Sequence, residues 1–305
     1  MADTSAQRII VSSILGVYPN LHIVGEEDES VEVDIEYQRK LRNDLLNGHE
    51  WTVPTTTSSS IHNELPPKEL EMDQVTVYVD PLDGTREFVE GRLDNVQSLI
   101  GVCYKGKPLC GAIGLPFPSL ESGNSTEVVF GLIGKGIGKV CTKLDSNEND
   151  IITCGVPDFK QYQDGDTIYV SSGDSPSVRS AVDLADTTFE NKGGITRQVV
   201  GATGNKLLRV AHGSTTLSLL HTKTSLWDTA APTAILEAMG GKVTDYFGEP
   251  LIYNTKELGN KMGVVASTPG ARNEHDSIVK AMRGNKGVLP ILKGGLDCTN
   301  YDGMQ

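Results

Sequence analysis

The strongest constraint on the fold of this chain is the alternation of strand-like and helix-like segments after residue 155. Runs rich in β-branched residues are separated by segments whose apolar residues recur at helical spacing. The predicted strands are residues 167–171, 195–200, 216–221 and 262–267, and the predicted helices are residues 176–185, 204–212, 229–239 and 271–282. Such alternation favours a sheet covered by helices, so we expect residues 156–305 to form an α/β layered domain.

Before residue 155 the pattern is instead one of hairpins. Residues 98–104 and 108–114 are predicted to pair across a turn at residues 105–107, and residues 127–131 and 136–141 indicate a second antiparallel pair. The other predicted elements are a helix at residues 4–18, strands at 21–24 and 75–79, a polar helix at 31–49 and a surface loop at 52–74. We therefore expect residues 1–155 to form an α+β domain with helices packed on an antiparallel sheet. The tail from residue 284 is expected to be irregular.

The charge of the chain limits its partners. The 305 residues include 40 Asp and Glu against 27 Lys and Arg, a net charge of -13. A nucleic-acid polymer is an unsuitable partner, because the chain has no surplus of basic residues to displace counterions from phosphates. Smaller phosphorylated molecules remain possible where carboxylates first bind metal cations.

Cysteine usage and the N-terminus favour a cytoplasmic protein. The five cysteines are odd in number and none has CxxC spacing, so we expect reduced thiols rather than a disulfide framework or a zinc site. The first residues lack the basic start and apolar core of a signal peptide. No window approaches roughly 18 uninterrupted apolar residues, so no membrane span is expected. The oligomeric state is not readable from the sequence.

Residues 80–85 (DPLDGT) form the central candidate motif. A strand leads into Asp80, Pro81 fixes φ, and Gly84 permits a tight turn. The carboxylates of Asp80 and Asp83 can converge, and their mutual repulsion would be removed by a hard divalent cation such as Mg²⁺. The backbone N–H groups of Gly84 and Thr85 could then bind a phosphate oxygen. The alternative is an ordinary Asp-Pro turn in which Asp83 caps the chain.

Three further acidic residues are candidates for the same site, and each also has a simple structural interpretation. Glu26 begins an acidic run that could be solvated surface. Asp228 stands before a predicted helix, where it could act only as an N-cap, and Asp3 could cap the first helix in the same way. In the central motif, the D-x-x-D spacing of Asp80 and Asp83 differs from the D-x-D-x-D-G run of an EF-hand. It also differs from the D-x-D that is typical of a phosphatase with an Asp nucleophile.

Taken together, these motifs resemble the signature of the lithium-sensitive, magnesium-dependent phosphatases related to inositol monophosphatase. The residues that carry the resemblance are Gly25-Glu26-Glu27, residues 80–85, and Trp227-Asp228 followed by Gly240-Gly241, in the family's order. The resemblance covers nearly the whole chain. It implies the α-β-α-β-α layered fold of sugar phosphatases. Residues 80–116 and 201–213 resemble most the branch of the family that hydrolyses 3'(2'),5'-bisphosphate nucleotides.

The resemblance also implies roles for individual residues. Glu26, Asp80 and the Leu82 carbonyl would hold one Mg²⁺, and Asp80, Asp83 and Asp228 a second. A third, weaker ion would lie near Glu26. Asp3 and Thr85 would form the dyad that orients and deprotonates a metal-bound water for in-line attack, without a covalent intermediate.

The implied substrate is 3'-phosphoadenosine 5'-phosphate, which would give AMP and phosphate. The turn at residues 201–206 opens a predicted helix, whose N-terminus favours anions, so we expect Gly204, Asn205 and Lys206 to contact the nucleotide. A glycine turn with a surface lysine is the alternative. Ser171, Ser172 and Lys223 are further candidate contacts in the same cleft.

Two departures from the family pattern modify these expectations. Close nucleotidase relatives often have lysine where Leu226 stands, which affects the adenine side of the site. Members usually carry one or two helices ahead of the segment with Asp3, which is here the third residue, so Asp3 is expected to be weakly held. Two alternative functions stay open: an inositol phosphate phosphatase, and a chain that binds metal and nucleotide with little turnover.

Overall fold

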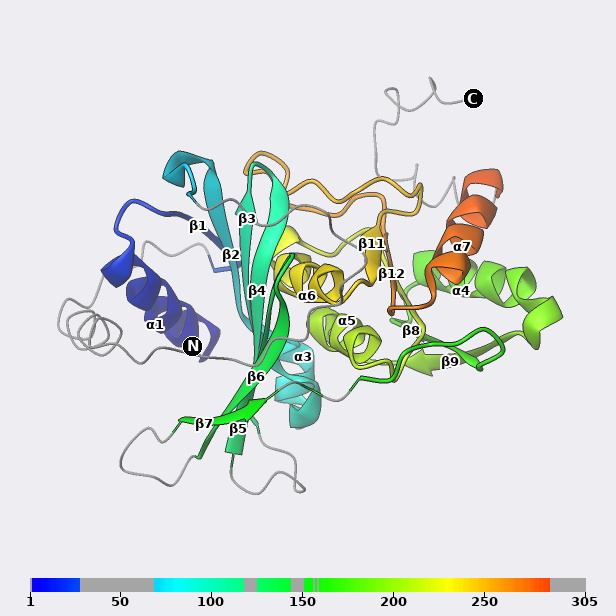
Figure 1. The fold of residues 1–305 in the computed structure, drawn as a ribbon, viewed down its shortest axis with the longest axis horizontal. Helices are drawn as coiled ribbons and strands as arrows, with labels where there is room; N and C mark the ends of the chain where they lie inside the picture. Colours follow the sequence, from blue (N-terminus) through cyan, green and yellow to red (C-terminus); the bar gives the residue numbers. More distant parts are fainter. Residues whose placement is uncertain are drawn as a thin grey trace.

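The computed structural model describes residues 2–27, 69–117, 125–143, 151–155, 157 and 159–285. Two β-sheets alternate with three layers of helices (Figure 1). Helix α1 (Ala2–Val17) covers the outer face of the first sheet, and α5 (Thr203–Ala211) and α6 (Leu226–Ala238) lie between the sheets. Helices α4 (Pro176–Thr188) and α7 (Arg272–Gly284) cover the second sheet from outside. This is the expected α-β-α-β-α arrangement.

The first sheet contains every described strand up to residue 155. Its order is β1-β2-β3-β4-β5-β6-β7, with β1 and β2 parallel and all other neighbours antiparallel. The strands are β1 (His22–Gly25), β2 (Val75–Asp83), β3 (Gln97–Tyr104), β4 (Lys107–Leu115), β5 (Ser125–Leu132), β6 (Gly136–Lys143) and β7 (Ile151–Gly155). The predicted hairpin of β3 and β4 turns at Lys105 and Gly106, which both have positive φ, as a two-residue hairpin turn requires.

The second sheet contains the described strands after residue 160. Its order is β11-β12-β10-β8-β9, in which β8 pairs in parallel with β9 and β10, while β12 runs antiparallel to β10 and β11. The strands are β8 (Ile168–Ser172), β9 (Ile195–Val199), β10 (Leu217–Leu220), β11 (Lys242–Thr244) and β12 (Val264–Ser267). Two short helical elements, α3 (Thr85–Val89) and the 3₁₀ turn η2 (Leu93–Asn95), connect β2 to β3.

Glycines let α6 lie close against the first sheet. Gly101, Gly111 and Gly131 are aligned across β3, β4 and β5, since Gly111 pairs with both of the others. A Cβ atom on any of them would press against α6: at Gly101 and Gly111 it would overlap Ala230 or Ala231. The three glycines thus form a smooth track on the sheet, and the middle helical layer is seated on it.

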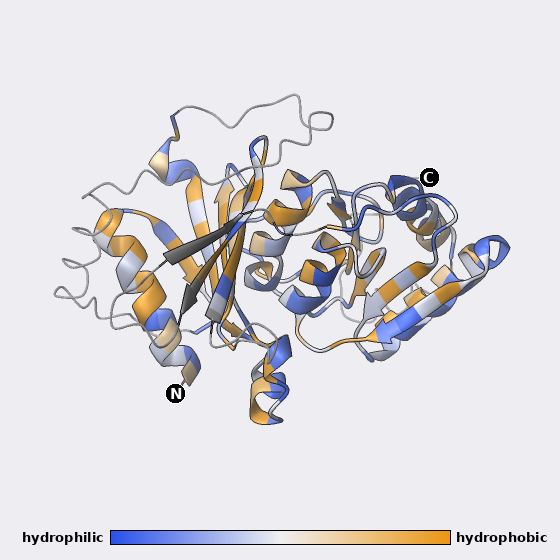
Figure 2. Cartoon of the chain, turned by 60° about the horizontal axis from the view of Figure 1, so that its bottom comes forward, coloured by the Kyte–Doolittle hydropathy of each residue, from blue (hydrophilic) through white to orange (hydrophobic). Residues whose placement is uncertain are grey.

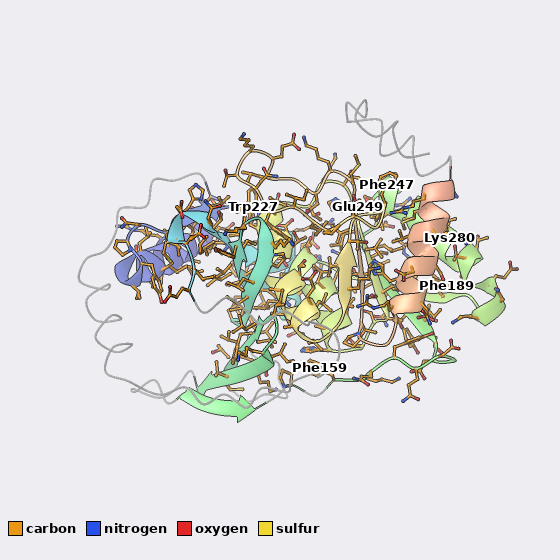
Figure 3. The ribbon with its side chains drawn as sticks, turned by 45° about the horizontal axis from the view of Figure 1, so that its top comes forward. Phe159, Phe189, Trp227, Phe247, Glu249 and Lys280 are labelled. Carbon is orange, nitrogen blue, oxygen red and sulfur yellow. The ribbon has the colours of Figure 1, made fainter. Side chains whose placement is uncertain are left out.

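The hydrophobic core between the two sheets joins both halves of the chain. It combines first-sheet residues such as Leu99 and Ile113 with Leu207 of α5, Ile235 of α6 and Val264 of the second sheet. Figure 2 shows the hydrophobic stretches that the strands contribute. A second core lies under α4 and α7, where Phe189 and Phe247 pack beside α7 (Figure 3). The proposed division into domains 1–155 and 156–305 stays a prediction, although the strands change sheet at this point.

Most predicted elements agree with the structure, but several boundaries differ. The strand predicted at residues 75–79 continues to Asp83, and the helix predicted from residue 229 begins at Leu226. The short elements β7, β11 and α3 were not predicted. The polar helix at 31–49, most of the loop at 52–74 and the tail from residue 286 lie outside the described residues.

Two further expectations are addressed by the described part of the chain. Cys103 and Cys110 are free thiols, whereas Cys141 is disulfide-bonded, so the expectation of reduced thiols throughout was wrong for this residue. Among the described residues, no helix is both long and apolar enough to span a bilayer.

Candidate active site

A bulge at the end of β2 brings the two aspartates of the central motif to one side. Asp80 pairs with Leu99 and Asp83 with Gln97, a register shift that inserts one extra residue around Pro81. In a regular strand, residues three apart point to opposite faces. With the bulge, Asp80 and Asp83 both line the same cleft. Gly84 then takes a left-handed conformation with φ of 90°, which starts α3.

Asp80 and Glu26 lie side by side because β1 and β2 are parallel. Gly25 pairs with Val79, and the Glu26 amide donates to the Val79 carbonyl at 3.1 Å. Asp80 is 1% exposed, and its Oδ1 accepts the Leu82 amide at 3.0 Å. Burial, followed by the charges of Asp83 and Glu26, raises the pKa of Asp80 well above its usual value. Burial likewise raises the pKa of Glu26.

Helix α1 anchors the segment that carries Glu26. The Gln7 side chain donates to the Glu27 carbonyl at 2.5 Å and accepts the Glu27 amide at 3.0 Å. Asp3 lies one turn before Gln7, and its charge contributes to the raised pKa of Glu26. Asp3 is near the acidic group but is not among the residues that line the cleft.

The N-terminal turn of α5 holds Asp83. The backbone amides of Thr203 and Gly204 donate to its two carboxylate oxygens at 3.1 and 2.5 Å. These bonds and the charge of Lys206 stabilise the ionised form, but burial outweighs them and raises the pKa of Asp83 to about 6. A carboxylate from the first sheet is thus oriented by a helix from the second half of the chain.

Asp228 reaches the site from the first turn of α6. The Ser225 amide donates to its Oδ2 at 2.8 Å, which forms a capping box with Ser225 as N-cap. The simple alternative that Asp228 is itself the N-cap was therefore wrong. Burial, followed by repulsion from Asp83, raises the pKa of Asp228 to about 8.

The cleft has a volume of about 910 Å³. The structure brings together eight of the predicted site residues in its lining: Glu26, Asp80, Leu82, Asp83, Gly84, Thr85, Lys206 and Asp228. The Thr85 hydroxyl donates to the Leu82 carbonyl at 3.3 Å. Lys206, only 7% exposed, donates through Nζ to the Ala202 carbonyl at 2.8 Å.

Five predicted contact residues do not line the cleft. Ser171 is fully buried, and its hydroxyl donates to the Lys206 carbonyl at 3.4 Å. Ser172 accepts a hydrogen bond from Arg197. Gly204 and Asn205 are engaged with Asp83 and Asn95. Lys223 is exposed, and its backbone amide donates to His221.

The lining also contains residues that sequence reasoning missed. They are Arg86, Glu87, Arg92, Asn95, Gly173, Asp174, residues 198–203, Arg209 and His221. The first four follow the central motif within ten residues, so the signal was the continuation of that motif. Arg209 lies three residues after Lys206, on the same helix face.

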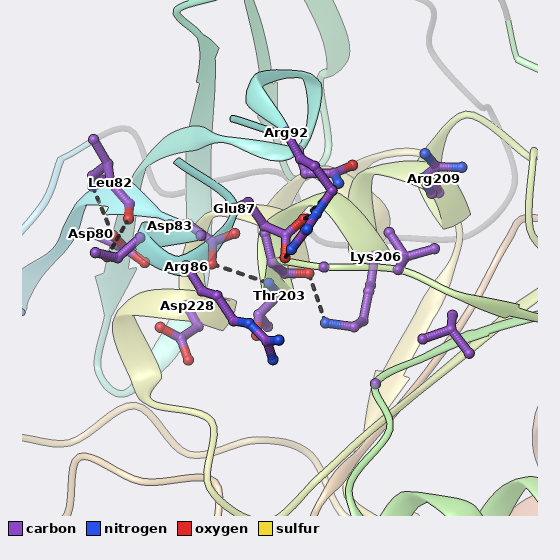
Figure 4. Close-up of a pocket in the computed structure, with 18 of the residues that line it drawn as sticks. Asp80, Leu82, Asp83, Arg86, Glu87, Arg92, Thr203, Lys206, Arg209 and Asp228 are labelled. Carbon is purple, nitrogen blue, oxygen red and sulfur yellow. Dashed lines mark hydrogen bonds and ion pairs between the residues drawn. The ribbon is translucent and has the colours of Figure 1, made fainter. Parts of the chain in front are cut away.

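The cleft has an acidic side and a basic side. Asp80, Asp83 and Asp228 lie on one side and Lys206 and Arg209 on the other (Figure 4). The acidic side offers carboxylate and carbonyl oxygens, which are the donors that Mg²⁺ prefers. Within the described residues, no three His, Cys, Asp or Glu side chains already form a complete cation site. A cation bound on the acidic side would offset the repulsion that raises the pKa values of Asp80 and Asp228.

Comparison with known proteins agrees with the sequence resemblance. A model of the inositol monophosphatase family matches residues 1–286. The chain is 32% identical over 277 residues to 3'(2'),5'-bisphosphate nucleotidase 1 of Homo sapiens, covering 87% of this chain and 77% of that protein. It is 29% identical over 267 residues to the Dictyostelium discoideum protein of the same name, covering 87% and 79%.

Solved structures share the fold. Inositol monophosphatase-II from Staphylococcus aureus superposes with a TM-score of 0.60 at 16% identity, covering 96% of this chain and 86% of that one. A structure titled as 2'AMP-bound SaIMPase-II has a TM-score of 0.58 at 16% identity, covering 96% and 88%. At such identities the likeness shows the layered architecture alone.

Proposed function

The chain belongs to the inositol monophosphatase family and is a phosphoric monoester hydrolase, and on this premise we propose that it removes the 3'-phosphate of 3'-phosphoadenosine 5'-phosphate in a Mg²⁺-dependent reaction. Water attacks the 3'-phosphorus in line, the bond to the ribose 3'-oxygen breaks, and that oxygen takes a proton. The products are AMP and inorganic phosphate.

The division of the cleft into an acidic and a basic side is the observation that carries this proposal. Arg86 and Arg92 are paired with Glu87 and Glu90. None of the ion pairs among the described residues uses Lys206 or Arg209. Two cations that make no direct ion pair, opposite a cation-binding side, suit a substrate with two phosphates, one at each side. A monophosphate of inositol leaves the second side unused.

The residues of the acidic side would hold the metal ions. Glu26, Asp80 and the Leu82 carbonyl would bind one, and Asp80, Asp83 and Asp228 another. Bound Mg²⁺ would neutralise the phosphate charge and lower the pKa of the attacking water.

We assign proton handling to Thr85 and Asp3. The Thr85 hydroxyl stands at the start of α3 and can accept a hydrogen bond from the attacking water. Its own proton points to the Leu82 carbonyl in the structure, so passing it to Asp3 requires the hydroxyl to rotate. Lys206 and Arg209 would bind the second phosphate, whose position then sets the 3'-phosphate against the acidic side.

Phosphate release from a small panel of substrates tests the proposal. We expect 3'-phosphoadenosine 5'-phosphate to exceed both 3'-AMP and inositol 1-phosphate by at least about tenfold in kcat/KM, the worth of roughly one ion pair. All turnover should need Mg²⁺. Asp83→Asn serves as the control and should lower kcat/KM by ~100-fold or more, because it removes a metal-binding charge.

Other outcomes of the panel would contradict specific parts of the proposal. Equal or better hydrolysis of inositol 1-phosphate would favour the inositol phosphatase alternative. Nucleotide binding without Mg²⁺-dependent hydrolysis would show that the chain binds without turnover. Near-normal activity of Asp83→Asn at ordinary Mg²⁺ would remove Asp83 from the metal site.

A further inference from the structure

We propose that Glu87 is a positioning residue of this active site, which ties the segment of α3 and η2 to the first turn of α5 and so keeps the Thr203 and Gly204 amides on Asp83. The effect on turnover rests on the proposed function, but the effect on Asp83 does not.

Glu87 is a buried carboxylate of the cleft lining that accepts three side-chain hydrogen bonds. It is 6% exposed, and Arg92 donates to both of its oxygens, through Nε at 2.7 Å and Nη2 at 2.8 Å. Asn95 adds a third bond through Nδ2 at 2.9 Å. The bonds from Arg92 are the main reason that the pKa of Glu87 is lowered to about 2. The group is therefore a fixed negative charge and cannot serve as a proton acceptor at neutral pH.

Glu87 and Asn95 both touch the start of α5. A Cβ atom on Gly201 would overlap the Glu87 carboxyl group, so the carboxylate lies directly against the Gly201 backbone. Asn205, in the first turn of α5, donates through Nδ2 to the Asn95 Oδ1 at 2.7 Å. The chain Arg92–Glu87–Asn95–Asn205 thus connects the two halves of the protein at the cleft; we refer to it as the polar clasp.

The turn that the polar clasp holds is strained. Ala202 has φ of 58° and ψ of 143°, a strained conformation that L-residues rarely adopt. Such a residue keeps its conformation only where its surroundings hold it. Here Lys206 binds the Ala202 carbonyl, and a Cβ at Gly84 would stand 3.0 Å from the Ala202 Cβ. Gly201, directly before it, is held by Glu87.

The strained turn aims its amides at Asp83. Thr203 and Gly204 directly follow Ala202, and both donate to Asp83. If the polar clasp is released, the turn can relax and the two amides move off the carboxylate. Asp83 would then lose its orientation, although no atom of Glu87 touches it in the hydrogen bonds of the described residues.

The test compares Glu87→Gln with Glu90→Gln. Glu90 also pairs with Arg92 and with Arg86, but it is exposed and does not line the cleft, so it is a matched control. Without substrate, we expect Glu87→Gln to weaken Mg²⁺ or Mn²⁺ binding about tenfold, the typical effect of a residue that supports a ligand. Amide hydrogen exchange in residues 201–206 should accelerate by a similar factor. With substrate, kcat should fall while KM stays within about twofold.

Several results would overturn the proposal. Glu87→Gln and Glu90→Gln behaving alike would do so, as would a general loss of stability with unchanged ion affinity and unchanged exchange at residues 201–206. If Glu87→Gln does not fold, Asn95→Ala, Asn205→Ala and the double variant replace it. Their effects on ion affinity should be non-additive, and additive effects would contradict the polar clasp. If the wild type releases no phosphate from the bisphosphate, the proposed function fails, while ion binding and exchange still decide the role of Glu87.

Discussion

Among single residues, Ala202 has a strained backbone conformation at the candidate active site, and this strain lowers the stability of the folded protein. The residue has a backbone conformation that suits glycine, yet the chain has alanine there. Its position between Gly201 and the amides that hold Asp83 makes the strain useful, because a relaxed turn would direct those amides elsewhere.

Ala202→Gly should therefore stabilise the protein. Relief of about 1–3 kcal/mol of strain exceeds the roughly 0.5–1 kcal/mol of extra chain entropy that glycine loses on folding. We expect a net gain of about 1 kcal/mol in the free energy of unfolding, measured by urea denaturation. Ala181→Gly in the interior of α4 makes the same exchange without strain to relieve and should be destabilising. A loss of stability in Ala202→Gly as large as that of the control would show that residue 202 is not strained.

At the level of elements, the glycine track under α6 fixes the separation of the first sheet and the middle layer. The main chain of α6 lies where the Cβ atoms of Gly101 and Gly111 would otherwise stand. Since α6 carries Asp228 at its first turn, any outward shift of the helix would also move this carboxylate.

Gly111→Ala should lower the free energy of unfolding by about 1–3 kcal/mol, the usual cost of overpacking. Its Cβ would overlap main-chain atoms of Ala231. Unlike a flexible side chain, these backbone atoms cannot rotate out of the way. Gly114→Ala in the same strand is the matched control, because the nearest atoms to its Cβ belong to Ser98 at 3.8 Å, an ordinary contact. Thermal unfolding of the two variants measures the difference. Equal stability of both would mean that α6 can move away from the sheet at little cost.

Across the whole molecule, the buried carboxyl groups make folding stability depend on pH. The buried carboxyls of Asp83 and Asp228 have pKa values raised to about 6 and about 8. A carboxyl group whose pKa is higher in the folded than in the unfolded state binds its proton more tightly in the folded protein. Its contribution to the free energy of unfolding is complete below the unfolded pKa of about 4 and is lost as pH rises through the folded pKa. Between about pH 4 and pH 8 these groups therefore destabilise the metal-free protein progressively.

Mg²⁺ should raise the melting temperature more at about pH 8.5 than at about pH 5.5, because the ion binds the ionised carboxylates and must compete with protons at the lower pH. We expect the two increments to differ by roughly 5 °C or more in thermal-shift measurements. Asp228→Asn should flatten the pH dependence of the metal-free protein. An Mg²⁺ increment that is the same at both pH values would argue against ion binding by these carboxylates.

The sequence was sufficient to predict most of the long helices and strands, and to predict that the acidic residues Glu26, Asp80, Asp83 and Asp228 lie together in one cleft. The alternation after residue 155 correctly predicted the second sheet and its helices, since their apolar periods are long enough to read. The start of α6 was misplaced although Ser225 and Asp228 show the spacing of a capping box, and the three-residue strand β11 is too short for any period. The bulge at Asp80 and the glycine track depend on contacts between distant segments, which local patterns do not contain. For the same reason the hydrogen bond from Asn205 to Asn95 was not predicted, and the contact of Asn205 with the nucleotide stays a prediction.

The core shared by both halves has a consequence for the order in which this protein can be made. The first sheet is completed when β7 ends at Gly155, but α6, which packs against this sheet in the core, ends at Ala238. At about 5–20 residues per second, a ribosome needs roughly 4–17 s to synthesise the intervening segment. During that interval the nascent chain carries an uncovered apolar sheet. Its yield in the cell should therefore depend on how quickly residues 156–238 are translated, or on a chaperone that shields the sheet until α6 arrives.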